Sequence, residues 1–132
     1  MENSAKQVVF NFLNAVKEMD LDTVGMLLHP GVNWNQPGAN QLSGIKTSGA
    51  EVFQMVGRMF ELSGNTMRLT KFSPISVNGE RVACLLNWHA TNAAGEELNV
   101  NNIDVYSVNN GHIVNVEIFT EDPEQEDNFW GK

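Results

Sequence analysis

Hydrophobic residues recur at helical spacing near the start of the chain. Ser4 and Gln7 have the spacing of a capping box, a pattern that commonly opens a helix. The apolar positions that follow at helical intervals are Ala5, Val8, Val9, Phe12, Leu13 and Val16. Asp20 can cap a short second helix, which we expect to end at His29-Pro30-Gly31 because proline cannot continue the helical hydrogen bonds. The pattern therefore predicts a hairpin of two amphipathic helices.

A third amphipathic segment begins at Ser48, which forms a second capping box with Glu51. Its apolar face consists of Val52, Phe53, Val56, Met59 and Phe60. Gly64 is typical of a helix end. Between the second and third helices, Val32–Asn35 predicts a short strand, and the Gly, Asn and Pro of residues 36–49 predict a loop.

Beyond Gly64 the hydrophobic period becomes that of a strand. The four alternating segments are Met67–Val77, Arg81–Thr91, Glu97–Val108 and Ile113–Thr120. Short turns containing Asn and Gly join them, which predicts an antiparallel meander. Because the helices come first and the strands after, we expect an α+β fold with three N-terminal helices packed on one face of an antiparallel sheet.

The chain has 132 residues, of which 42% are hydrophobic, and this suits a single domain over residues 1–132. An acidic tail begins at about Glu121 and would be interpreted as disordered from its charge alone. The tail nevertheless contains Phe129-Trp130 close to its end. Since two aromatic side chains gain from burial, we expect this terminus to fold back onto the body of the domain.

Charge and cysteine content exclude several classes of function. With 8 Lys and Arg against 16 Asp and Glu, the net charge of -8 disfavours nucleic acid and acidic membrane surfaces as partners. The first residues lack the regions of a signal peptide, and the single Cys84 cannot form an internal disulfide, so we expect a cytoplasmic protein. No metal-ligand spacing occurs, and residues 44–49 carry their lysine in the wrong place for a phosphate loop. We expect no metal, nucleotide or other cofactor.

One predicted strand carries a carboxylate among apolar residues. Alternation puts on one face Val100, Asn102, Asp104, Tyr106 and Val108. If this face points inward, Asp104 lies in an apolar cavity beside an amide and a phenol, and desolvation raises its pKa. The alternative is a strand aspartate that is exposed or bonded to a neighbouring strand. For Tyr106 the alternative is a plain core role, since its hydroxyl needs one partner only.

The order of elements and four short motifs resemble the NTF2-like superfamily, in particular its SnoaL-like and ketosteroid isomerase branch. The motifs are Asp20-Leu21-Asp22, Pro30-Gly31-Val32, Leu42-Ser43-Gly44, and Ile103 to Tyr106 leading to Gly111-His112-Ile113. The resemblance covers nearly the whole chain. It implies a cone formed by a curved sheet around three helices, an apolar pocket inside the cone and, commonly, a homodimer.

The resemblance also assigns catalytic positions, of which this chain keeps one of three. The oxyanion-hole aspartic acid of the isomerases falls on Asp104, two residues before Tyr106. Their oxyanion-hole tyrosine falls on Phe12, which has no hydrogen-bond donor. Their catalytic base falls on or next to Trp34, whose indole cannot accept a proton. We therefore do not expect ketosteroid isomerase activity.

Other candidate residues depend on which strand face is concave. The expected ligand-binding residues are Phe12, Trp34, Val56, Phe60, Asn102 and Tyr106. Only one of Trp88 and His89 can face inward. If His89 does, it is a weak candidate for a general acid or base near Asp104, and otherwise it is a surface or interface histidine. Glu121 is a weak second carboxylate candidate. The expected structural residues are His29, His112 and the buried, inert Cys84.

Three functions remain open from the sequence. The first is a cofactor-free enzyme that carries out proton-transfer chemistry of the isomerase, cyclase or hydratase type on a small, largely apolar molecule at Asp104. The second is a protein that binds such a ligand without catalysis, and the third is a structural homodimer. We expect a homodimer built on the outer face of the sheet, because three helices cannot cover both faces of four long strands.

Overall fold

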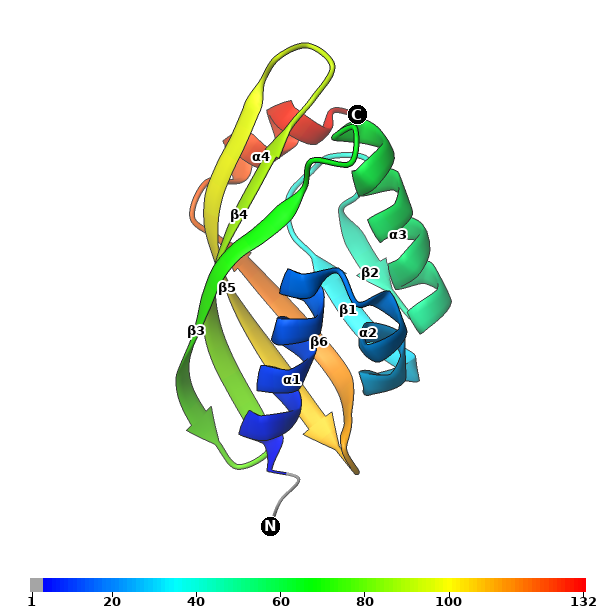
Figure 1. Ribbon diagram of the computed structural model, residues 1–132, viewed down its shortest axis with the longest axis vertical. Helices are drawn as coiled ribbons and strands as arrows, with labels where there is room; N and C mark the ends of the chain where they lie inside the picture. The colour runs from blue at the N-terminus through cyan, green and yellow to red at the C-terminus, as the bar shows by residue number, and fades with distance from the viewer. Residues whose placement is uncertain (1–3) are drawn as a thin grey trace.

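A six-stranded sheet curves around the helices of this protein (Figure 1). This confirms the α+β class predicted from the order of the elements and the curved sheet that the resemblance implies. The computed structural model describes residues 4–132, apart from the side chains of residues 74 and 75. The helices are α1 (Ala5–Glu18), α2 (Leu21–Leu27), α3 (Gly49–Leu62) and α4 (Pro123–Trp130). The strands are β1 (Leu28–Gln36), β2 (Gly44–Lys46), β3 (Arg68–Asn78), β4 (Arg81–Thr91), β5 (Glu97–Asn109) and β6 (His112–Thr120).

The predicted caps start the three N-terminal helices. The side chain of Ser4 accepts a hydrogen bond from the Gln7 amide at 3.2 Å, and Ser48 accepts one from the Glu51 amide at 3.1 Å. Asp20 caps α2 in the same way. Each bond satisfies a backbone N–H that has no partner within the helix. These local signals fix the starting points of the helices that cover the sheet.

The end of α2 differs from the prediction. The helix stops at Leu27, and β1 begins directly at Leu28, so that His29-Pro30-Gly31 lies in a strand. The pairing of β1 with β6 shifts its register between Leu28 and Asn33, which is where proline, lacking an N–H, would interrupt a regular ladder. Proline predicts a helix stop from the sequence alone, whereas in the structure it lies in an irregular part of a strand.

The sheet order is β2-β1-β6-β5-β4-β3. The predicted antiparallel meander, β3 to β6, forms four of these strands, but β1 joins β6 in parallel. The region 36–49, predicted as a loop, contains the short strand β2, which pairs with β1. Helix α1 packs on β3, β4 and β5, while α3 packs on β1 and β2. The helices thus cover the concave face of the sheet.

The acidic tail forms helix α4 instead of a disordered segment. Asp122 caps it by accepting a hydrogen bond from the Gln125 amide at 3.1 Å. Phe129 and Trp130 are buried, with their rings edge to face, which confirms that this terminus folds back. Helix α4 packs against β5 near one end of the long β4–β5 hairpin (Figure 1). The burial of two aromatic side chains therefore orders this segment despite its negative charge.

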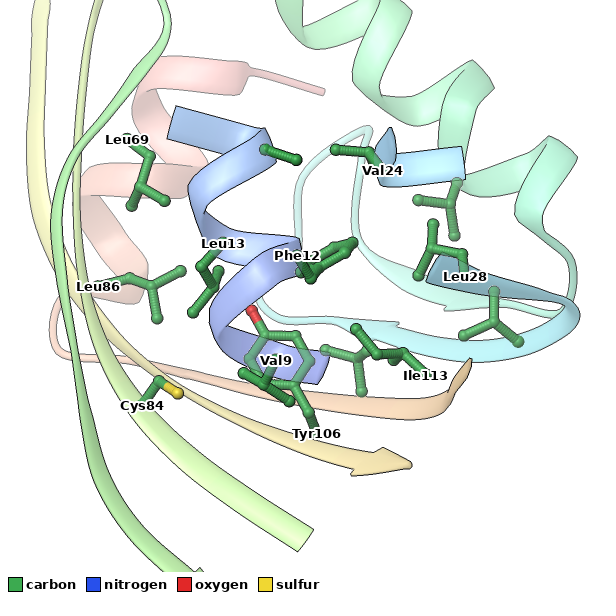
Figure 2. Close-up of a cluster of buried hydrophobic side chains, with 14 of the residues drawn as sticks. Val9, Phe12, Leu13, Val24, Leu28, Leu69, Cys84, Leu86, Tyr106 and Ile113 are labelled. Carbon is green, nitrogen blue, oxygen red and sulfur yellow. The ribbon is translucent and has the colours of Figure 1, made fainter. Parts of the chain in front are cut away.

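The hydrophobic core lies between α1 and the inner face of the sheet. Figure 2 shows Tyr106 on β5 pointing toward Phe12 on α1, and their ring centroids are 5.7 Å apart. Along β5 every second residue from Leu98 to Val108 is buried, so the face that carries Asp104 points inward. Cys84 is fully buried, as predicted, and burial raises the pKa of its thiol to about 12. A thiol that stays protonated is inert.

Candidate functional site

A cavity of about 120 Å³ lies between the helices and the inner face of the sheet. The structure places around it all six residues that the sequence predicts as ligand-binding, together with Asp104. They come from four elements: Phe12 from α1, Trp34 from β1, Val56 and Phe60 from α3, and the remaining three from β5. Other apolar side chains complete the wall, among them Leu13, Val52, Met55, Met59, Leu69, Trp88, Leu98, Val100 and Ile118. The cavity is therefore largely apolar, with a few polar groups, most of them on the sheet.

Asp104 is the central polar group of the cavity and is only 3% exposed. Its neighbours across the two flanking strands are Cys84 on β4 and Ile118 on β6, neither of which is charged. The Tyr106 hydroxyl donates a hydrogen bond to Asp104 Oδ2 at 2.7 Å. The other carboxyl oxygen, Oδ1, is buried without a hydrogen-bond partner among the described residues. A buried acceptor without a partner is uncommon in proteins and calls for an explanation, of which a catalytic role is one.

Burial raises the pKa of Asp104 to about 7. The hydrogen bond from Tyr106 opposes this rise, and the negative charge of Glu126 adds to it. The pKa of the Tyr106 phenol is itself raised well above its ordinary value by burial and by Asp104. Tyr106 therefore remains a hydrogen-bond donor, and the Asp104 carboxyl can exist in its neutral form near pH 7.

Glu126 is a second carboxyl group in the cavity that the sequence analysis did not identify. It comes from α4 and is 3% exposed. The side-chain amide of Asn102 fits its hydrogen-bonding neighbours only in one of its two orientations. In that orientation its nitrogen can donate to Glu126 Oε2 at 3.2 Å and to Thr120 Oγ1 at 3.1 Å. Burial raises the pKa of Glu126, while hydrogen bonds from Thr120 and Asn102 oppose the rise. The available signal was the helical spacing of Glu126 with Phe129 and Trp130, which places all three on one face of a helix.

Trp34 occupies the place where the resemblance puts a catalytic base. Its indole N–H donates a hydrogen bond to Gln36 Oε1 at 3.0 Å, and Gln36 is buried. This bond fixes the orientation of the indole ring, and the ring offers no proton acceptor. Trp34 therefore acts as a wall of the cavity.

His89 does not reach the cavity. Trp88 lines it, and alternation places His89 on the opposite face of β4, where it pairs with Arg68 on β3 and Asn99 on β5. The condition under which His89 would be a general acid or base near Asp104 is therefore not met. Glu121 is also outside the cavity wall and accepts a hydrogen bond from the backbone N–H of Asn101 at 3.0 Å.

The two remaining histidines lie against each other at the surface, with ring centroids 6.3 Å apart. His29 is in β1, not at a helix end as expected, and its Nδ1 accepts a hydrogen bond from the Gly31 amide at 2.9 Å. Among residues 4–132, no group of three or more His, Cys, Asp or Glu is placed to hold a metal ion. The same part of the chain contains no helix long and apolar enough to cross a membrane.

Comparisons with known proteins identify the family. Residues 9–116 match the SnoaL-like domain. A solved protein of unknown function from Xanthomonas campestris, described as having a cystatin-like fold, is 31% identical, with a TM-score of 0.92 over 98% of this chain and 99% of that one. An NTF2-like protein from Burkholderia pseudomallei is 24% identical, with a TM-score of 0.84 over 100% of both chains.

A third solved structure, a candidate polyketide cyclase from Pseudomonas putida, is 17% identical, with a TM-score of 0.70 over 88% of this chain and 90% of that one. The search of curated proteins found no match. The family match spans most of the chain and agrees with the observed fold. The chain therefore belongs to the SnoaL-like domain family and has the NTF2-like fold.

Proposed function

We propose that the protein is a cofactor-free enzyme that transfers a proton on a small, largely apolar carbonyl compound, with Asp104 as the acid. The observation that carries this proposal is the buried oxygen Oδ1 of Asp104, which faces no donor in an otherwise apolar surrounding. Because Oδ2 already accepts the Tyr106 hydroxyl, a proton on the carboxyl group is expected on Oδ1. In that form Oδ1 can donate a hydrogen bond to a carbonyl oxygen of a ligand.

The low polarity of the cavity strengthens such a hydrogen bond. Negative charge develops on a carbonyl oxygen when a proton leaves the neighbouring carbon, and a fixed donor in a water-poor site stabilises that charge. Asp104 with a pKa of about 7 is well matched to give and take a proton near neutral pH. Cyclisation of a polyketide, the reaction class in the name of the Pseudomonas putida structure, also begins next to a carbonyl group.

The size of the cavity limits the ligand. An engineered apolar cavity of roughly 150 Å³ in another protein holds a benzene molecule. At about 120 Å³, the present cavity is slightly smaller than that one, so it limits the ligand to a short chain or at most a single small ring. A fused-ring steroid does not fit this volume. Phe12 and Trp34 also replace the donor and the base that steroid isomerisation requires, so the proposal does not include that reaction.

The test of this function is the substitution Asp104→Asn, which keeps the shape of the side chain but removes its ionisable carboxyl group. We expect a loss of turnover of at least about 100-fold with little change in ligand affinity. Cyclic ketones screened by ligand-observed NMR supply the ligand, and their turnover is followed in the same samples. Asp22→Asn is the matched control, because Asp22 is an exposed carboxylate on α2. This variant should behave as the wild type. Full turnover in the Asp104→Asn protein would refute the role of Asp104.

A second candidate function is ligand binding without catalysis. The observation that favours it is the chemistry of Phe12 and Trp34, which line the cavity but supply no donor or base for a reaction. In this case Asp104 would fix one polar contact of the ligand. The NMR screen then finds ligands that bind, but none that is converted by the wild-type protein.

We also propose that two copies of the chain associate through the outer face of the sheet. Three large apolar side chains lie in register on adjacent strands of that face, namely Leu85, Ile103 and Phe119. They are 42%, 42% and 58% exposed. An exposed apolar patch of this kind is typical of an interface. A structural homodimer whose cavity has no ligand would share this interface, and the ligand screen distinguishes the two cases.

A further inference from the structure

Two carboxyl side chains from distant parts of the sequence meet at the same cavity. Asp104 comes from β5 and Glu126 from α4, and each is only 3% exposed. Asn102 stands on the same face of β5 as Asp104, two positions away, and its amide also contacts Glu126. Among the described residues that line the cavity, there is no Lys, Arg or His to balance two negative charges. At neutral pH a pair of buried carboxyl groups in such surroundings is expected to keep one proton.

The surroundings of the two groups differ, and the difference decides which one keeps the proton. With the Asn102 amide turned so that its nitrogen points at Glu126, that nitrogen lies 3.2 Å from Glu126 Oε2, and both Asn102 and Thr120 lower the pKa of Glu126. Donors of this kind stabilise a carboxylate. Asp104 receives a single donor, the Tyr106 hydroxyl, and its Oδ1 is bare. The geometry therefore favours a proton on Asp104 and the negative charge on Glu126.

We propose that Glu126 is the base of this site and that the substrates are carbonyl compounds with an acidic C–H next to the carbonyl group. This inference rests on the proposed function of Asp104 as the acid, and it adds the base that the reaction also needs. Opposed environments for two titratable groups in one site are the usual sign of a division into acid and base. The base comes from the C-terminal helix and not from β1, where Trp34 stands.

The reaction step balances without a cofactor. The Glu126 carboxylate takes a proton from the carbon next to the carbonyl group, and the electron pair of that C–H bond forms a carbon–carbon double bond. The carbonyl π electrons move to oxygen, which takes the proton of Asp104 Oδ1. The products are an enol, a neutral Glu126 and an ionised Asp104. Return of the two protons restores the enzyme. Delivery of the Glu126 proton to a conjugated carbon gives an isomerised ketone, and delivery to the same carbon after Glu126 has exchanged its proton with solvent gives an exchanged ketone.

The step requires Glu126 ionised and Asp104 neutral, so the rate should have a bell-shaped dependence on pH. Burial raises the pKa of both groups, for Asp104 to about 7. The groups that act on Asp104 are Tyr106 and Glu126, while those that act on Glu126 are Thr120, Asn102, Asp127 and Asp122. None of them carries a positive charge. The falling limb of the profile should therefore belong to Asp104 and the rising limb to Glu126.

The experiment follows exchange of the α-protons of cyclohexanone in D₂O by proton NMR. We expect the wild-type protein to accelerate exchange, and Glu126→Gln to lower the protein-dependent rate by at least about 100-fold, with binding of cyclohexanone retained. Glutamine can still accept the hydrogen bond from Asn102, which helps to preserve the fold. Glu126→Asp keeps a carboxylate and should retain part of the rate, with a rising limb still present in the pH profile.

Glu124→Gln is the matched control, because it makes the same change at an exposed position of α4. It should leave the rate and the pH profile unchanged. If Glu126→Gln exchanges cyclohexanone at the wild-type rate while Asp104→Asn does not, Glu126 is not the base and the proposed role of Asp104 stands. If Glu126→Gln does not fold, Glu126→Asp provides the test. A pH profile of that variant without a rising limb would also refute the inference. A wild-type protein that gives no exchange at all would remove the proposed function and this inference with it.

Discussion

At the scale of single residues, the main feature is an ionisable group held where water does not reach it. Asp104 has one hydrogen bond, from Tyr106, and one oxygen without a partner. A carboxylate in such a place costs free energy, while a neutral carboxyl group costs less. This carboxyl group therefore links the stability of the fold to pH.

The pKa of Asp104 fixes the direction in which the free energy of unfolding changes with pH. The pKa of Asp104 is 3.8 as an ordinary carboxyl group and about 7 in the fold, so between these values the folded state holds a proton that the unfolded state has released. The free energy of unfolding should therefore fall as the pH rises from about 4 to about 7, by up to about 4 kcal/mol from this group. The raised pKa of Glu126 acts in the same direction. Urea unfolding at several pH values measures the slope.

Asp104→Asn should remove most of this slope, because an amide does not titrate. Asp22→Asn, on the exposed side of α2, should keep it. Equal slopes in the wild type and in Asp104→Asn would show that the carboxyl group is not desolvated as the structure indicates.

How far the site could be predicted differs from residue to residue. Alternation along one strand was sufficient to place Asn102, Asp104 and Tyr106 together, because the period of a strand fixes which side chains share a face. The inward direction of that face could not be deduced, since it depends on which side the helices cover. Glu126 was missed because an acidic segment was interpreted as a tail, although Phe129 and Trp130 share its helical face.

At the scale of elements, α4 depends on a tight contact with the loop that follows β1. Asp127 Oδ1 accepts hydrogen bonds from the Ala39 amide and from Asn40 Nδ2, both at 2.8 Å. The Gln41 side chain donates to the Trp130 carbonyl oxygen at 2.7 Å. Through these bonds the loop holds in place the helix that supplies Glu126 to the cavity.

At Gly38 this contact leaves no space for a side chain. Its φ is +95°, and a Cβ atom there would lie 2.6 Å from Asp127 Oδ1. Gly38→Ala should therefore lower the free energy of unfolding by about 1–3 kcal/mol and speed up amide exchange in α4. Urea unfolding and hydrogen exchange measure the two effects.

Gly44→Ala is the control for backbone strain alone, because Gly44 has a φ of +113° and nothing within 4 Å of its Cβ position. It should destabilise the protein less than Gly38→Ala and leave exchange in α4 unchanged. Equal effects of the two substitutions would mean that the contact with Asp127 does not hold the helix.

The elements that the sequence predicted well have local signals, and those it predicted poorly do not. Helices α1 and α3 have capping residues and a regular apolar face, and the strands β3 to β6 have turns with Asn and Gly. The short β2 has only three residues, too few for a recognisable alternating pattern, and it pairs with the preceding strand β1. The parallel pairing of β1 with β6 joins distant parts of the chain, so no pattern within either segment indicates it.

At the scale of the whole molecule, the sheet has one covered face and one open face. The helices cover the concave side, while the row of Leu85, Ile103 and Phe119 on the other side is exposed in the single chain. Burial of apolar area is worth roughly 25 cal/mol per Å², so this row favours association with a second copy of the same surface.

We expect a dimer at micromolar concentration, with about twice the 14.6 kDa mass of the chain. Ile103→Lys should shift the equilibrium to the monomer, because the interface would bury an unpaired charge. Ile45→Lys is the control, since Ile45 is 59% exposed on β2, at the opposite edge of the sheet from β3. Sedimentation equilibrium measures both. A wild-type protein that sediments only as a 14.6 kDa species would contradict the expected dimer.

The wall of the cavity has two sides of different stiffness. The sheet side is fixed by strand pairing and hydrogen bonds, whereas four methionines line other parts of the wall, namely Met19, Met55, Met59 and Met67. A methionine side chain is unbranched and adapts its shape at low cost. Under the proposed function, substrate range and reaction chemistry would depend on separate groups of residues. Exchange of these methionines for larger or smaller residues should retune which molecules are accepted while the proton-transferring groups remain as they are, a starting point for redesigning the protein toward chosen substrates.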